Sequence, residues 1–170
     1  MCSSRSLKLK MSMHESKAIE VLQPDLEKAL FGTSAPVRVL VVDDDPVTGE
    51  LLKSIGERDG YEVVSVDDGR KAFRLLKSDA NFMAAVFNMT TPNFMGLDLV
   101  RYMKTEKRLI RIPVVIVAGD TGLKRITESF AAGALVFLPK PFTTEKLALT
   151  LRLARCSRAG RKRPDVRLEN

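Results

Sequence analysis

Between residues 37 and 151, short runs of apolar, mostly β-branched residues alternate with longer stretches whose apolar positions recur every three or four residues. The short runs are typical of β-strands, and the longer stretches, about ten to fourteen residues each, have the period of amphipathic helices. Some of the runs are almost continuously apolar, which indicates parallel strands covered by helices on both faces. The pattern predicts an α/β fold of five strand–helix units. The predicted strands are Val37–Val42, Tyr61–Val66, Met83–Phe87, Ile112–Val117 and Ala134–Leu138.

Each predicted strand is followed by a predicted helix. Asp45 is a suitable N-cap for the first helix, because its carboxylate can accept a free backbone N–H and Pro46 is favoured at the first helical position. Thr143 is the corresponding cap of the fifth helix, which can continue as far as Gly160. The apolar positions expected to face the sheet are, in chain order, Leu51, Leu52 and Ile55; Ala72, Phe73, Leu75 and Leu76; Leu97, Leu99, Val100 and Met103; Ile126, Phe130 and Ala131; and Leu147, Leu151 and Ala154.

Two segments lie outside this alternation, so we expect three regions: an N-terminal extension and linker over 1–36, partly helical or disordered, a domain over 37–152, and a basic tail over 153–170. The net charge of +7 is unevenly distributed between them. Residues 152–170 carry seven basic and two acidic side chains, whereas residues 37–151 carry sixteen and fifteen. The high isoelectric point therefore describes the tail, and the domain itself is nearly neutral.

Composition excludes several classes of protein. No apolar run approaches the roughly 20 residues of a membrane-spanning helix, and the first ten residues lack the apolar core of a secretory signal. We therefore expect a cytoplasmic protein. The two cysteines, Cys2 and Cys156, have neither disulfide-framework nor metal-site spacing and are expected to be free thiols.

Polar residues follow four of the five predicted strands. Asp43-Asp44-Asp45 follows the first, Asn88 begins the segment after the third, Ala118-Gly119-Asp120 follows the fourth, and Pro139-Lys140-Pro141 follows the fifth. In a parallel α/β sheet the carboxyl ends of the strands meet at one edge, where functional groups gather. Adjacent carboxylates facing a lysine across a crevice are suited to a divalent cation and a phosphate group.

Three separated motifs, Val39–Asp45, Asn88–Gly96 and Leu138–Phe142, resemble those of the receiver domain of two-component response regulators. The resemblance covers residues 37 to 152. It implies a flavodoxin-like (βα)5 fold, a three-layer sandwich around a parallel five-stranded sheet of strand order 2-1-3-4-5. In this family a phosphoryl group moves from a histidine kinase to an aspartate at the end of the third strand, with magnesium held beside it.

The resemblance assigns roles to individual residues. Asp43 and Asp44 match the acidic pair that holds the metal, and Thr90 matches the residue whose backbone carbonyl completes the metal site. Lys140 matches the lysine that pairs with the phosphoryl group, and Phe137 matches the switch aromatic. Without a phosphoryl group, Lys140 is expected to form a structural ion pair with Asp44, while Asp45 acts as the helix cap. Asp43 and Asp44 are then expected to be held by backbone amides or by Lys140.

Two positions depart from the family pattern. Asn88 stands where the phosphoacceptor aspartate belongs, and Ala118 stands where a Ser or Thr hydroxyl holds the transferred phosphoryl group. An amide has no carboxylate nucleophile, so Asn88 cannot form an acyl phosphate. The pocket charge, counted over Asp43, Asp44 and Lys140, falls to −1 from the −2 of three carboxylates and a lysine, so magnesium should bind only weakly, if at all. Ala118 has no hydroxyl donor to report phosphate.

These features predict a stand-alone pseudo-receiver that acts in signal transduction by phosphorylation-independent protein–protein interaction and is not an enzyme. By family resemblance, the partner surface is the face of the fourth helix, fifth strand and fifth helix, here residues 131–137 and 144–153. A homodimer through this face is one candidate. No cofactor is expected to be required.

Two alternatives remain open. A substitute acceptor, Thr90, Thr91 or Asp44, would make the chain a working phosphorelay component. The basic tail could instead bind nucleic acid or an anionic membrane surface, although it has no aromatic residue for stacking bases and a nucleic-acid role is therefore disfavoured.

Overall fold

A computed structural model describes residues 36–160 except positions 92 and 94. Five strands and five helices alternate along this part of the chain. The strands are β1 (Val37–Val42), β2 (Tyr61–Val66), β3 (Ala84–Asn88), β4 (Val114–Ala118) and β5 (Val136–Pro139). The helices are α2 (Pro46–Asp59), α3 (Gly69–Ser78), α4 (Gly96–Thr105), α5 (Leu123–Ala132) and α6 (Thr144–Gly160).

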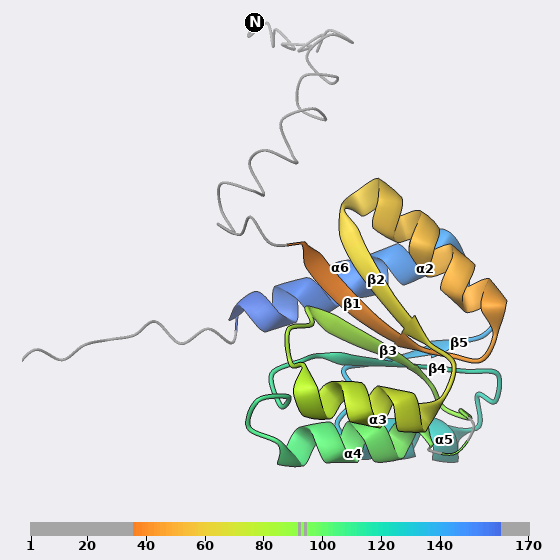
Figure 1. The fold of residues 1–170 in the computed structure, drawn as a ribbon. Coiled ribbons are helices and arrows are strands. Elements are labelled where there is room, and N and C mark those ends of the chain that lie inside the picture. Colours follow the sequence, from red (N-terminus) through yellow and green to blue (C-terminus); the bar gives the residue numbers. More distant parts are fainter. Residues whose placement is uncertain (1–35, 92, 94, 161–170) are drawn as a thin grey trace, which may run out of the picture. The chain divides into compact units, whose positions relative to one another are not determined.

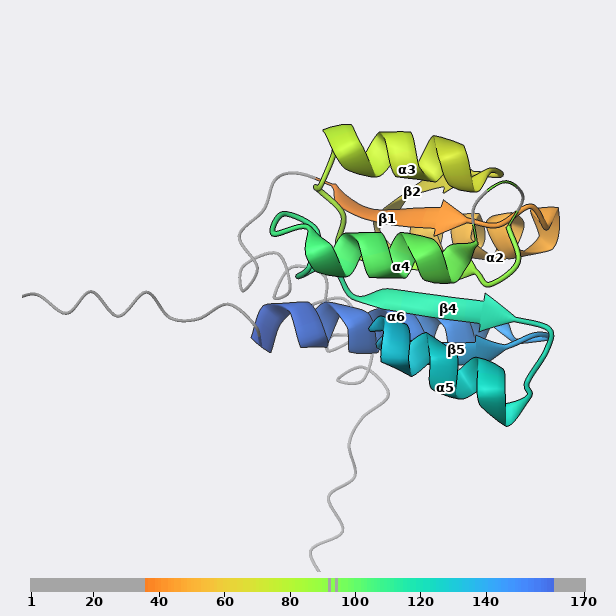
Figure 2. The same cartoon turned by 90° about the horizontal axis from the view of Figure 1, so that it is seen from below.

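The five strands form one parallel sheet in the order β2-β1-β3-β4-β5, as the resemblance predicts. Helices α3, α4 and α5 cover one face of the sheet, and α2 and α6 cover the other (Figures 1 and 2). Each face has its own apolar core, and side chains alternate between the two cores along every central strand. Leu40 and Val42 of β1 face α3 and α4, for example, while Val39 and Val41 face the opposite layer.

Both predicted helix caps are confirmed. The carboxylate of Asp45 accepts a hydrogen bond from the backbone N–H of Val47 at 3.0 Å, and Pro46 opens α2. The hydroxyl of Thr143 accepts one from the backbone N–H of Lys146 at 3.3 Å at the start of α6.

Two sequence-based details were wrong. The last three strands begin one or two residues later than predicted, and β4 begins at Val114 because the preceding Pro113 has no N–H to donate to a neighbouring strand. On α5, Phe130 and Ala131 are exposed, whereas Ser129 and Ala132 are buried. The buried stripe of this helix includes small residues, so the larger side chains were poor markers of its inner face.

Gly96 allows α4 to begin directly against the end of β3. A Cβ atom at this position would lie 2.2 Å from the backbone carbonyl oxygen of Asn88, and the backbone N–H of Gly96 donates to the carbonyl of Met89 at 3.3 Å. Any side chain here would push α4 away from the strand end. Gly96 therefore fixes how closely α4 approaches the end of β3.

We expect Gly96→Ala to lower the free energy of unfolding by about 2–4 kcal/mol, because the obstructing atoms belong to the backbone and cannot rotate away. Chemical denaturation measures the change. Gly119→Ala is the matched control, since a Cβ there meets nothing within 4 Å, and it should change stability by no more than about 0.5 kcal/mol. Equal effects of the two substitutions would contradict this explanation.

Candidate functional site

The polar residues predicted to meet at one edge of the sheet do so. Asp43 and Asp44 follow β1, Asn88 ends β3 and Lys140 follows β5, so the side chains come from the carboxyl ends of three strands. β1 and β3 are neighbours in the sheet, and the helices that follow them cover opposite faces. This switch point is where open α/β sheets bind ligands.

Asp43 is the buried centre of the site, with a side chain only 1% exposed. Its Oδ1 accepts hydrogen bonds from the backbone N–H of Asp45 at 3.0 Å and from the Asn88 amide at 2.9 Å. Its Oδ2 accepts from the Lys140 ammonium group at 2.8 Å. Both oxygens of the buried carboxylate are therefore satisfied by the protein itself.

Asn88 is buried between the two carboxylates. Its Nδ2 donates to Asp43 Oδ1 at 2.9 Å and to Asp44 Oδ1 at 3.1 Å, and its Oδ1 lies 3.5 Å from the backbone nitrogen of Thr90. The two protons of one neutral amide group thus each meet a different carboxylate. A carboxylate at position 88 could make neither bond.

Lys140 pairs with Asp43 at 2.8 Å and with Asp45 at 3.3 Å, so the predicted ion pair with Asp44 was wrong. Asp44 is exposed and accepts from Asn88 instead. Asp45 consequently has two functions, as helix cap and as a second partner of the lysine. Its pKa lies below the ordinary value, chiefly because the backbone N–H of Val47 bonds to the carboxylate and secondly because Lys140 does.

The Asn88 amide occupies the position between the two carboxylates where a divalent cation would be expected. A cation between Asp43 and Asp44 needs acceptor oxygens around it, whereas the Asn88 amide directs its N–H donors at both carboxylates. Across residues 36–160, apart from the two undescribed positions, no group of three or more acidic, histidine or cysteine side chains is placed to hold a metal.

The two predicted switch positions differ in environment. Ala118 is buried at the end of β4, where its carbonyl accepts the backbone N–H of Lys140 at 2.7 Å. Its methyl group supplies no hydrogen bond to the pocket. Phe137 is half-buried on β5 and packs against the core beneath α3, α4 and α5. Thr90 is exposed beside Asn88, and Thr91 is buried.

Sequence reasoning missed one contact near the site. Asn93 has a positive φ of 63°, and its amide donates to the Asp68 carboxylate at 2.8 Å. Asp68 also caps α3 through the backbone N–H of Arg70. The contact joins the loop after β3 to the start of α3. An Asn in a turn near a proline was a signal for the left-handed conformation, although nothing in the sequence indicated its partner.

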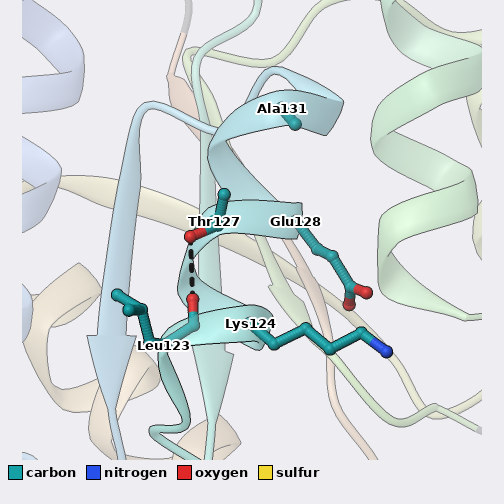
Figure 3. Close-up of a pocket in the computed structure, with 5 residues that line it drawn as sticks. All are labelled: Leu123, Lys124, Thr127, Glu128 and Ala131. Carbon is teal, nitrogen blue, oxygen red and sulfur yellow. Dashed lines mark hydrogen bonds between the residues drawn. The ribbon is translucent and has the colours of Figure 1, made fainter.

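A second surface feature lies on α5, away from these carboxylates. A shallow hollow of about 440 Å³ is lined by Leu123, Lys124, Thr127, Glu128 and Ala131 (Figure 3). The Thr127 hydroxyl donates to the carbonyl of Leu123 at 2.8 Å, which keeps that hydroxyl occupied within the helix. Leu123 is 80% exposed and Phe130 is 50% exposed, so α5 presents substantial apolar surface to solvent.

A family model of the response regulator receiver domain matches residues 39–152. The chain belongs to this family. Receiver domains act in two-component signalling, and the position of the pocket agrees with the family fold. Within the described part of this receiver domain, no helix is long and apolar enough to cross a membrane.

Similar proteins include two-component and chemotaxis regulators. The two-component response regulator ORR11 of Oryza sativa is 34% identical over 110 residues, which are 65% of this receiver chain and 75% of the relative. Chemotaxis protein CheY1 of Helicobacter pylori is 29% identical over 112 residues, covering 65% and 90%. Among solved structures, chemotaxis response regulator CheY4 of Vibrio cholerae gives a TM-score of 0.65 at 26% identity, covering 71% of this chain and 99% of that one.

In this receiver domain, we expect Asn88→Asp to lower the free energy of unfolding by about 1–3 kcal/mol in a chelator, because two hydrogen bonds are replaced by repulsion between carboxylates. Repulsion raises the pKa of the introduced carboxyl group in the folded state. The deficit should therefore be largest near neutral pH and shrink as the pH falls and that group is protonated. Chemical denaturation across the acidic range measures it.

Asn88→Ala is the control, since it removes the same two hydrogen bonds without adding charge. Its deficit should depend less on pH than that of Asn88→Asp. An Asn88→Asp variant as stable as the native chain at neutral pH would show that the amide hydrogen bonds do not matter to the fold.

Proposed function

We propose that this protein is a pseudo-receiver, which signals by binding a protein partner without accepting a phosphoryl group. The proposal rests on the chemistry and hydrogen bonding of the Asn88 side-chain amide. Its amide nitrogen is delocalised and donates to both Asp43 and Asp44, so the position offers no nucleophile to a phosphoryl donor. On this proposal the domain performs no chemistry of its own.

The loss of the hydroxyl at position 118 supports the same conclusion. In a working switch, a hydroxyl at the end of β4 would bind the phosphoryl oxygen and draw the following loop toward the pocket. Ala118 cannot do so, and Lys140, the group that would pair with phosphate, is held by Asp43 and Asp45. The domain then remains in one conformation, and its output depends on the amounts of protein and partner.

We further propose that no divalent cation is required. Asn88 supplies N–H donors where a cation would supply positive charge, and Lys140 neutralises the second oxygen of Asp43. The carboxylates are thus compensated by groups within the chain. A cation would have to displace the amide from both of them, which makes binding weak.

The partner surface in this proposal is the face of α5, β5 and α6. Three exposed side chains on the two helices support it: Leu123 and Phe130 on α5, and Leu153 on α6. Burying exposed leucine and phenylalanine side chains in an interface removes apolar surface from water, and this favours binding. This face also carries Phe137 of β5, which links its surface to the core.

The substitute-acceptor alternative rests on Thr90, Thr91 or Asp44. Thr91 is buried and Asp44 already accepts a hydrogen bond from Asn88, while Thr90 is exposed. The tail alternative depends largely on residues 161–170, which lie outside the described part of the chain. Neither alternative gains a supporting contact from the residues described.

The first test is incubation with acetyl phosphate and magnesium, followed by intact mass measurement. The native chain should acquire no phosphoryl group, because position 88 lacks a carboxylate. Asn88→Asp combined with Ala118→Thr should acquire one, since both missing groups are then restored beside Lys140. An adduct on the native chain would contradict the proposal and would be mapped to Thr90, Thr91 or Asp44.

The proposed face has a separate test. We expect the native chain to form a concentration-dependent dimer in sedimentation experiments and the double substitution Leu123→Ser with Phe130→Ser to weaken it about tenfold or more. Val47→Ser is the control, because Val47 is 58% exposed at the start of α2, outside this face. A dimer unaffected by the double substitution would exclude the face as a homodimer interface.

A further inference from the structure

A rigid loop lies at the opposite end of the sheet from the pocket. Residues 106–113 connect α4 to β4 at the end where the strands begin (Figures 1 and 2). The backbone N–H of Leu109 donates to Glu106 at 2.9 Å, and that of Ile112 donates to Leu109 at 2.8 Å. The side chains of Leu109 and Ile112 are fully buried in the core under α3 and α4. Two turns and two buried anchors therefore fix the loop.

Four further side chains of this loop are exposed, whereas that of Glu106 is half-buried. Lys107, Arg108 and Arg111 are exposed, and Ile110 lies among them with 44% of its surface exposed. The Arg108 guanidinium donates to the backbone carbonyl of Lys77 at 3.0 Å, which brings the exposed end of α3 beside the loop. We call these five residues the cationic surface.

Within the described residues, none of the four cations of this surface has an ion-pair partner. Lys77 lies in the last turn of α3, where a cation is favoured by the helix dipole. Lys107 and Arg108 directly follow the C-cap of α4 and gain from the same effect, whereas Arg111 lies further along the loop. Without ion-pair partners, these cations add little to the stability of the fold.

We propose that the cationic surface binds an acidic, amphipathic protein segment whose apolar side chain packs on Ile110. Charge complementarity identifies the partner as acidic, since the surface carries four cations without an ion-pair partner against one acidic neighbour, Glu106, and includes the exposed side chain of Ile110. This arrangement, an apolar centre within a charged rim, is that of a protein-binding site. The loop is held in place by Leu109 and Ile112, so little ordering cost opposes binding.

Nucleic acid fits this surface less well than an acidic protein segment. The aromatic rings beside Lys77, those of Phe73 and Tyr102, are half-buried against each other with centroids 4.6 Å apart and offer no stacking platform. Ile110 also offers an apolar contact that a phosphate backbone cannot use.

Binding here would be independent of the pocket. Asn88 and Lys140 lie at the carboxyl ends of the strands, whereas residues 107–111 lie at the amino ends. The surface is also distinct from the exposed side chains of Leu123 and Phe130 on α5. The inference therefore goes beyond the proposed function, and it can fail while the pseudo-receiver proposal holds.

The test uses a synthetic peptide designed as an amphipathic helix, with a leucine stripe flanked by glutamates, titrated into the isotopically labelled full-length chain. Amide chemical shifts in NMR spectra should move at residues 107–112 and at the end of α3, and the affinity should fall as salt is added. The double substitution Lys107→Glu with Arg111→Glu should weaken binding about tenfold or more. Neither of these side chains has a contact that maintains the fold, so the variant should remain stable.

Ile110→Ser separates the apolar contribution from charge and should weaken binding several-fold at unchanged net charge. The control is Lys53→Glu with Arg70→Glu, two exposed cations elsewhere on the domain, which should leave the affinity unchanged. Duplex DNA of equal charge should bind more weakly than the peptide. No shift changes at millimolar peptide, equal weakening by the control pair, or tighter binding of DNA would each overturn the inference.

Discussion

The buried carboxylate of Asp43 is the constraint on which the arrangement of this edge of the sheet depends. An unpaired carboxylate removed from water costs several kcal/mol, so a folded chain must supply partners for both oxygens. Here the partners come from Lys140 after β5, Asn88 at the end of β3 and the backbone at Asp45. Meeting this one requirement brings three strand ends together. The pocket therefore has a defined geometry with Asn88 and Ala118 at the positions where the resemblance expects a carboxylate and a hydroxyl.

On the proposed function, this explains why a receiver pocket can persist as structure without phosphoryl transfer. An amide has nearly the shape of a carboxylate but can donate hydrogen bonds, so it fits between two carboxylates that would repel a third. Gly96 contributes from the other side, because α4 begins close against the backbone carbonyl of residue 88. This backbone contact does not depend on which side chain residue 88 carries.

Much of the fold followed from the sequence because its signals were local. Hydrophobic alternation located all five strands, and Asp45 and Thr143 marked helix starts through bonds to residues two or three positions away. The errors arose where local signals compete. Phe130 is a larger apolar residue than Ser129, yet the inner face of α5 has room only for the smaller side chain. Among three consecutive aspartates, the choice of partner for Lys140 depended on how β1 ends in three dimensions.

The backbone around Asn88 also affects how long its side-chain amide survives chemically. Asparagine side chains convert slowly to aspartate when the backbone nitrogen of the next residue attacks the amide carbon. In this chain the nitrogen of Met89 is engaged in a 2.9 Å hydrogen bond to the carbonyl of Val117, and both residues are buried. The sheet thereby withholds the attacking group. The fold itself therefore suppresses spontaneous deamidation, which on the proposed function would turn this amide into the missing carboxylate.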